Sequence, residues 1–241
     1  MSVGQSVCIS GTDRGIGLAL VKNYLHLGCT VYAGGINPDY EALAQLGEQF
    51  PGQLHISRLD VGSDESVKAF AASIASQTDK LDLLINNAAI LGETKLTIED
   101  EMDFDEIQRV YNISAVGAIR LTNALIHPIM NGGKQIVMIS SEAGSIGDSY
   151  REAWFGYCMA KAALNMGSTM IHNRIRERGG RVLVLHPGWV KTAMSGTWSD
   201  EGRYTPEKAA ANIVHQIHIL QGEIREQPIY IAVDSGKELA W

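Results

Sequence analysis

The sequence contains no run of basic residues and has a net negative charge. Its 241 residues include 20 Lys and Arg against 27 Asp and Glu, which gives a formal charge of −7. Nucleic acids and anionic membrane surfaces select for clustered Lys and Arg, so this composition argues against both as partners. Hydrophobic residues make up 45% of the chain, enough for the core of one large domain.

Long hydrophobic runs and a targeting segment are also missing. No apolar run reaches the roughly 18 residues that a membrane helix requires. The first ten residues, MSVGQSVCIS, lack the charged start and the long apolar stretch of a signal peptide. We therefore expect a cytoplasmic protein with no membrane partner.

Cysteine is scarce as well. Cys8, Cys29 and Cys158 form an odd number, and their spacing fits neither disulfides nor a metal site. We expect reduced thiols and no bound metal.

What the chain does have is a regular alternation of short aliphatic runs and longer segments of helical period. We predict strands at residues 6–10, 30–34, 54–58, 81–86, 135–140, 181–186 and 229–233. Helices are predicted at residues 16–27, 39–49, 65–78, 104–130, 157–177 and 206–221. This order predicts an α/β fold: one doubly wound Rossmann domain over residues 1–241, with a seven-stranded parallel sheet flanked by helices on both faces. Two long connections, residues 88–103 and 188–204, are expected to bind ligands, the second as a substrate loop.

A glycine-rich turn joins the first predicted strand to the first helix in ISGTDRGIG. Gly11, Gly15 and Gly17 would let the backbone approach a pyrophosphate and aim the helix N–H groups at it. The spacing G-x-x-x-G-x-G differs from the common G-x-G-x-x-G fingerprint, and taken alone it also fits a simple tight turn.

Polar or small residues follow two other predicted strands. Asp60 comes after the third strand, and Asn87 and Ala88 come after the fourth. The carboxyl ends of parallel strands share one sheet edge, where ligands bind in open α/β sheets. Helix capping or turn formation is the alternative role for Asp60 and Asn87.

A tyrosine and a lysine stand four residues apart at the start of a predicted helix. This spacing puts Tyr157 and Lys161 on one helix face, where a nearby ammonium favours the phenolate and suits the phenol for acid/base work. Such a pair is weak evidence by itself. Its position after Ser140 and Ser141, which end the fifth strand, strengthens the hypothesis of a shared pocket.

Together these motifs resemble the short-chain dehydrogenase/reductase family over nearly the whole chain. SGTDRGIG is similar to the family's T-G-x-x-x-G-x-G, NNAA to its N-N-A-G and YCMAK to its Y-x-x-x-K; LDV, YNISAVGAIRLT and HPGWVKT match further motifs. The long interval between Ser141 and Tyr157 resembles the branch that holds the C-factor and sniffer-type carbonyl reductases. Ser10, Ala89 and Ala160 depart from the usual residues without removing a reacting group.

The resemblance implies a role for each catalytic residue. Tyr157 would be the general acid/base, and Lys161 would lower its pKa and hold the nicotinamide ribose. Ser141 would orient the carbonyl, with Ser145 as a minor rival, and Asn112 would hold a water that links Lys161 to solvent. The implied cofactor contacts are Gly11, Arg14, Gly15, Ile16, Gly17, Asp60, Val61, Asn87, Ala88, Tyr157, Lys161, Pro187, Gly188, Val190 and Thr192.

The choice of nicotinamide cofactor rests on the end of the second strand. Enzymes of this fold that use NAD place an acid there, whereas the sequence reads AGGIN. Arg14 matches a position where many family members carry a basic residue for a 2′-phosphate. A second arginine near Ile36 is absent, so NADP(H) is favoured and NAD(H) stays possible.

The sequence therefore predicts an NADP(H)-dependent oxidoreductase acting on a small-molecule carbonyl or secondary alcohol. A nucleotide-binding regulatory or signalling protein is the alternative, and an epimerase or dehydratase is a weaker one. The long helices from Phe104 and Tyr157 resemble those that pair between subunits in the family, which implies a homodimer or homotetramer. Met159, Met166 and Met170 could serve that interface or the core.

Overall fold

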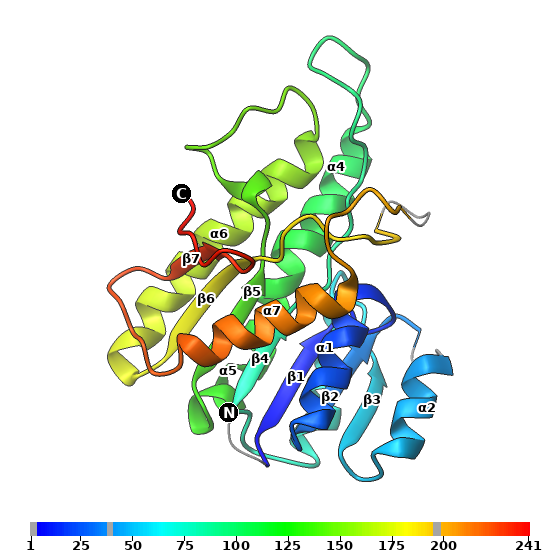
Figure 1. The fold of residues 1–241 in the computed structure, drawn as a ribbon, viewed down its shortest axis with the longest axis vertical. Coiled ribbons are helices and arrows are strands. Elements are labelled where there is room, and N and C mark those ends of the chain that lie inside the picture. The colour runs from blue at the N-terminus through cyan, green and yellow to red at the C-terminus, as the bar shows by residue number, and fades with distance from the viewer. Residues whose placement is uncertain (1–3, 38–40, 195–198) are drawn as a thin grey trace.

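The computed structural model describes residues 4–37, 41–194 and 199–241, and its strands form one parallel sheet. The strand order is β3-β2-β1-β4-β5-β6-β7, with helices on both sides (Figure 1). The strands are β1 (Ser6–Ser10), β2 (Thr30–Gly35), β3 (Leu54–Arg58), β4 (Leu83–Asn86), β5 (Gln135–Ile139), β6 (Arg181–His186) and β7 (Ile229–Ala232). The predicted fold class is confirmed.

Seven α-helices occur in the described residues. They are α1 (Gly15–His26), α2 (Glu41–Gln49), α3 (Asp64–Ala75), α4 (Phe104–Tyr111), α5 (Gly117–Asn131), α6 (Phe155–Ile175) and α7 (Pro206–Ile219). Side-chain caps start several of them: the Ser63 hydroxyl accepts from the Ser66 N–H before α3, and Asp103 caps α4. The start predicted for the second helix, at residue 39, lies outside the described residues.

Two hydrophobic cores lie on the two faces of the sheet. Side chains alternate along β1, so that Val7 and Ile9 face the core under α1, α2 and α7. Cys8 faces the opposite core, which α3, α5 and α6 cover. Burial on both faces is typical of a parallel sheet with crossover helices.

The long helix predicted at residues 104–130 is confirmed as one helical run over residues 104–131, but its hydrogen-bond pattern changes in the middle. A π-helical turn, Asn112–Val116, separates α4 from α5. By length and composition, residues 104–131 could cross a membrane, but half of the most apolar stretch is buried in the protein, as in a core helix. Directly after this turn, Gly117 packs so closely on Val61 that an added Cβ would lie 2.8 Å from the Val61 side chain.

Two long connections lie at the carboxyl edge of the sheet, as predicted. Residues 87–103 link β4 to α4, and residues 187–205 link β6 to α7. The second connection folds back on itself: the Lys191 N–H donates to the Tyr204 carbonyl at 2.8 Å, and Val190 pairs with Tyr204. Residues 195–198 of the predicted substrate loop lie outside the described residues.

Candidate active site

The ends of β1 and β4 are tied together by four hydrogen bonds. The Ser10 hydroxyl accepts from the backbone N–H groups of Asn87 and Ala88, at 3.0 and 3.1 Å. In return, the Asn87 amide donates to the carbonyls of Ser10 and Gly11, both at 3.0 Å. Asn87 and Ser10 therefore hold the glycine turn in place.

Two glycines of the turn are required by close backbone packing. A Cβ on Gly11, whose φ is +69°, would lie 2.8 Å from the Ala88 Cα. A Cβ on Gly17 would lie 1.9 Å from the Gly11 carbonyl oxygen. A side chain on Gly11 would push the turn away from the backbone after β4, and one on Gly17 would displace the backbone of Gly11.

Gly15 faces open space instead. Its φ is +57°, and an added Cβ would meet only the Thr192 hydroxyl, at 3.8 Å. Arg14, the N-cap of α1, is extended and makes no side-chain capping bond, so the first N–H groups of α1 are free to bind an anion. Arg14 and Gly15 also line a pocket with Lys22, Ala193 and Thr205. This cradle fits the pyrophosphate of a dinucleotide.

The structure brings a carboxylate to the end of β2, where the sequence shows none. Asp13 accepts hydrogen bonds from the backbone N–H groups of Ile36, at 3.2 Å, and Asn37, at 2.7 Å. It lies so close to Gly35 that a Cβ there would be 2.6 Å from its carboxylate. The sequence analysis missed Asp13 because it is 23 residues away from Ile36.

The side chains of Asp60 and Asn112 both form hydrogen bonds with Gly62 in the loop after β3. The Asp60 carboxylate accepts from the Gly62 N–H at 2.8 Å, which is the turn-forming alternative. The Asn112 amide donates to the Gly62 carbonyl at 3.1 Å and accepts from Arg120 at 3.0 Å. The roles expected of Asp60 toward adenine and of Asn112 toward a water near Lys161 stay predictions.

Of the three serines after β5, Ser141 reaches Tyr157. The Ser140 hydroxyl donates to Asn165 at 2.7 Å, and the Ser145 hydroxyl accepts from the Asp148 N–H at 3.0 Å. Of the three, Ser141 is the serine whose side chain lowers the pKa of the Tyr157 phenol, as a hydrogen-bond partner. This effect favours Ser141 over its rival Ser145.

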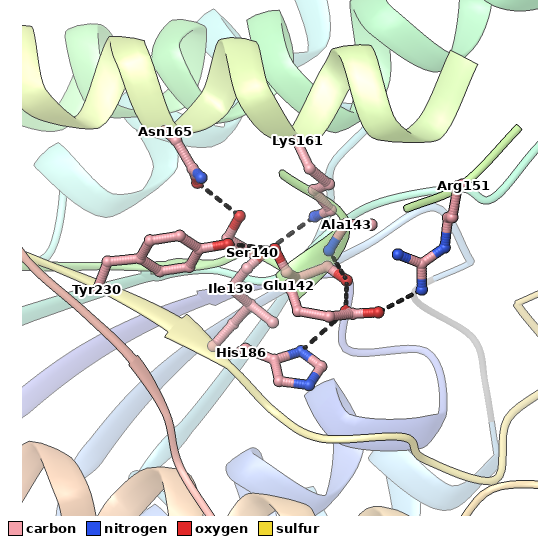
Figure 2. A network of polar contacts seen from close by, with 10 residues as sticks. Ile139, Ser140, Glu142, Ala143, Arg151, Lys161, Asn165, His186 and Tyr230 are labelled. Carbon is pink, nitrogen blue, oxygen red and sulfur yellow. Dashed lines mark hydrogen bonds and ion pairs between the residues drawn. The ribbon is translucent and has the colours of Figure 1, made fainter. Parts of the chain in front are cut away.

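Tyr157 and Lys161 are both buried at the start of α6. The Lys161 ammonium donates to the Ile139 carbonyl at 2.9 Å (Figure 2). It also lies 5.5 Å from the centre of the Tyr157 ring. Burial lowers the pKa of Lys161 to about 8. Burial raises the pKa of the Tyr157 phenol, and the neighbouring Ser141 hydroxyl only partly offsets this. Desolvation thus outweighs the effects that lower the pKa of Tyr157. The effect expected from Lys161 stays a prediction.

Three charged or titratable side chains that the sequence analysis did not select surround Ser141. The Glu142 carboxylate accepts from the Ser141 hydroxyl at 2.5 Å and forms an ion pair with Arg151. The His186 Nδ1 lies 3.5 Å from the same carboxylate (Figure 2). Burial acts to raise the pKa of Glu142, but the bond from Ser141 and the charges of His186 and Arg151 lower it overall.

The remaining predicted residues meet at the same edge of the sheet. They are Ile16 after β1, Val61 after β3, Ala88 after β4, and Pro187, Gly188, Val190 and Thr192 after β6. One edge of the sheet thus holds the N-terminus of α1, the glycine turn, and the Tyr157 phenol with the Ser141 hydroxyl. Such an arrangement can bind a dinucleotide and transfer a proton to a nearby oxygen.

Known proteins resemble this chain over most of its length. A profile described as short chain dehydrogenase matches residues 5–202. A 1-hydroxy-2-glutathionyl-2-methyl-3-butene dehydrogenase of Rhodococcus sp. (strain AD45) is 31% identical over 220 residues, 91% of this chain and 93% of that protein. The C-signal protein of Myxococcus xanthus is 32% identical over 131 residues, 54% of this chain and 76% of that protein. An NADPH-bound carbonyl reductase from chicken fatty liver has a TM-score of 0.84 and 32% identity, covering 100% of this chain and 96% of its own.

The packing of the glycine turn predicts unequal effects of two alanine substitutions. Gly17→Ala should lower the free energy of unfolding by about 2–3 kcal/mol, because its Cβ must displace the backbone of Gly11. Gly15→Ala should cost about 1 kcal/mol, because only its left-handed backbone is strained. Urea unfolding of both variants checks the order, and equal losses would contradict it.

Proposed function

The chain belongs to the short chain dehydrogenase family, and we propose that it is an oxidoreductase that interconverts a carbonyl compound and an alcohol. One observation carries the proposal: the buried Tyr157 phenol lies beside the Ser141 hydroxyl at the sheet edge where the glycine turn leaves a dinucleotide cradle. Residues 1–241 form the single domain that performs both tasks.

Each residue of the site has a separate task in this proposal. The N–H groups at the start of α1 and the Thr192 hydroxyl would hold the dinucleotide, whose nicotinamide supplies or accepts hydride when bound. Ser141 and Tyr157 orient the substrate oxygen, and the Tyr157 phenol gives that oxygen a proton during reduction. Lys161, fixed by the Ile139 carbonyl, places a buried positive charge beside the phenol in its ammonium form.

The names of the similar proteins indicate the functional group of the substrate. The names of the dehydrogenase from Rhodococcus and the carbonyl reductase from chicken describe an alcohol and a carbonyl group, respectively. A small molecule with either group would suit the proton transfer described above. We therefore propose a carbonyl or secondary alcohol as the substrate.

NADP(H) is the cofactor that we propose, with NAD(H) accepted less well. Arg14 stands at the glycine turn, and the similar chicken reductase binds NADPH. Asp13 acts in the opposite sense, because it supplies the carboxylate at the end of β2 that would bind a ribose 2′-hydroxyl and repel a 2′-phosphate. Arg14 and Asp13 together predict a modest preference for NADP(H) over NAD(H).

Substitutions of Arg14 and of Asp13 should shift the preference for NADPH over NADH in opposite directions. Arg14→Ala should weaken NADPH binding about tenfold and leave NADH binding nearly unchanged, since one charge-assisted hydrogen bond to phosphate is lost. Asp13→Asn should instead increase the preference for NADPH. Fluorescence titration with both cofactors measures this, with Glu48→Gln on the exposed surface of α2 as the matched charge control. Equal weakening of both cofactors by Arg14→Ala would refute the assignment.

The acid/base assignment predicts the effect of removing one oxygen. Tyr157→Phe should lower the rate of carbonyl reduction by about 10²- to 10⁴-fold, the usual range for a lost general acid. Cofactor binding should persist, because the glycine turn is untouched. Steady-state rates of NADPH oxidation with a panel of ketones and aldehydes check the prediction; a variant with undiminished turnover would rule the mechanism out.

A regulatory protein that binds the dinucleotide without turnover is the second candidate. The similarity to the C-signal protein of Myxococcus xanthus favours it. The same titrations and rate measurements separate the two candidates. Cofactor binding without turnover of any carbonyl or alcohol would favour the regulatory role.

We further propose that the protein is a homodimer or homotetramer built on α4 and α6. Three methionines on α6, which the sequence assigned to either the core or an interface, are exposed. The exposed fractions are 55% for Met159, 63% for Met166 and 66% for Met170. Phe104 on α4 is 65% exposed, and α4 packs against α6. These side chains therefore form an apolar surface that a second subunit would cover.

Sedimentation velocity at micromolar concentration tests the assembly. Met166→Glu should produce monomers, because a buried carboxylate in an apolar interface lacks a partner. Leu27→Glu, at the exposed end of α1 on the other side of the sheet, should leave the assembly intact. A monomeric wild-type protein would contradict the proposal.

A further inference from the structure

The backbone carbonyl of Ser141 is held by a side chain from β7, which lies two places from β5 in the sheet. The Tyr230 hydroxyl donates to the Ser141 carbonyl oxygen at 2.5 Å, although the two residues are 89 positions apart in the chain. The same oxygen accepts from the Gly144 N–H at 2.9 Å. A carbonyl oxygen has two lone pairs, so these two bonds fix the orientation of the peptide group that follows the Ser141 side chain.

A second side chain fastens the residues on either side of Ser141. Asn165 lies on α6, the helix that carries Tyr157, and its amide oxygen accepts from the Ser140 hydroxyl at 2.7 Å (Figure 2). Its amide nitrogen donates to the Gly144 carbonyl at 3.1 Å. The helix with the proposed proton donor thus holds both ends of residues 140–144, while β7 holds the carbonyl between them.

The Tyr230 ring is itself fixed by packing. Only 2% of Tyr230 is exposed, and the Trp241 ring lies against it with 5.2 Å between the ring centres. The chain reverses after β7, so that the Leu239 N–H donates to the Tyr230 carbonyl at 2.9 Å. A phenol packed this closely has little freedom to move, so its hydroxyl stays at the Ser141 carbonyl.

The segment that returns after β7 also holds a later part of the loop after Ser141. The Gly147 N–H donates to the Trp241 carbonyl at 3.1 Å, and the Ala240 N–H donates to the Asp148 carboxylate at 3.3 Å. A Cβ on Gly147 would lie 3.1 Å from that of Ala240. The long connection between β5 and α6 is therefore supported near its start by Tyr230 and again around residues 147–148.

We propose that Tyr230 is a positioning residue, which fixes the Ser141 hydroxyl for the substrate oxygen by holding the Ser141 carbonyl. The inference rests on the proposed function, in which Ser141 and Tyr157 orient that oxygen. The hydroxyl and the carbonyl of Ser141 are joined through one Cα, so a rotation of the peptide group displaces the hydroxyl. A displacement of about 1 Å in an orienting group lowers a rate by up to about 10²-fold. Tyr230 therefore acts on the reaction through Ser141.

A double-mutant cycle on the rate of carbonyl reduction tests the inference. Tyr230→Phe removes only the hydroxyl, and the Ser141 carbonyl keeps its bond from the Gly144 N–H, so the variant should fold. It should lower kcat about tenfold and leave NADPH binding unchanged, because the dinucleotide cradle is untouched. In a protein that carries Ser141→Ala, the same substitution should change kcat by less than about twofold, because the hydroxyl that it positions is gone.

Tyr24→Phe is the matched control. The Tyr24 hydroxyl is buried in the core under α1 and has no hydrogen-bond partner among the described residues, so its removal should leave kcat unchanged. Trp241→Ala keeps the Tyr230 hydroxyl but removes the packing of its ring, and it should cause a smaller fall in kcat. An equal fall for Tyr230→Phe with and without the Ser141 hydroxyl would show a purely structural role and overturn the inference.

A second measurement does not depend on turnover. Amide hydrogen exchange, followed by NMR, reports on the Gly144 N–H, which is bonded to the Ser141 carbonyl. Tyr230→Phe should speed this exchange about fivefold, the effect of one lost hydrogen bond, and Tyr24→Phe should not change it. If the wild-type protein reduces no carbonyl, the proposed function fails, while this exchange rate still decides whether Tyr230 holds the Ser141 peptide. Unchanged exchange at Gly144 in Tyr230→Phe would overturn the inference.

Discussion

The hydrogen bonds between the ends of β1 and β4 are the constraint on which the site depends. These strands are adjacent in the sheet although more than 70 residues separate them, as in the bond from Asn87 to Ser10. Successive crossovers run to opposite sides of this pair, so the sheet edge opens there. By joining the Ser10 hydroxyl and the Asn87 amide to both backbones, the clamp fixes the glycine turn over this opening. The direction of α1, and with it the anion-binding N–H groups, follows from that position.

Burial is the second physical influence on the site, and it is the largest cause of the pKa shifts of Tyr157 and Lys161. Tyr157 and Lys161 lie under the edge of the sheet with 9% and 2% of their surfaces exposed. Desolvation favours the neutral form of each, which keeps the proton on the phenol and reduces the affinity of the amine for its own. Glu142 and Arg151 form an ion pair nearby. The charge of Glu142 raises the pKa of Tyr157, and that of Arg151 lowers it. In the proposed function, the phenol would hold its proton until a substrate oxygen accepts it.

The sequence predicted the elements well because each carries a local signal. The alternating aliphatic runs identified all seven strands, and the largest difference at a start was in β4, predicted from residue 81 and observed from Leu83. The helix over residues 104–130 was found as predicted, but its periodic pattern gave no sign of the π-helical turn at Asn112–Val116. Directly after the turn, Gly117 packs closely on Val61, a contact between distant parts of the chain.

The sequence by itself determined the parallel sheet, the glycine turn and the Tyr157–Lys161 pair, because these follow from periodicity and from short motifs whose residues are neighbours in the chain. Only the tertiary structure decided which distant side chains complete the site. Asp13 reaches the end of β2, and Arg151 and His186 converge on Glu142, through loops whose paths no local pattern specifies. Charges that lie far apart in the sequence come together only when strand order and loop packing are fixed, so the electrostatics of the site belong to the fold.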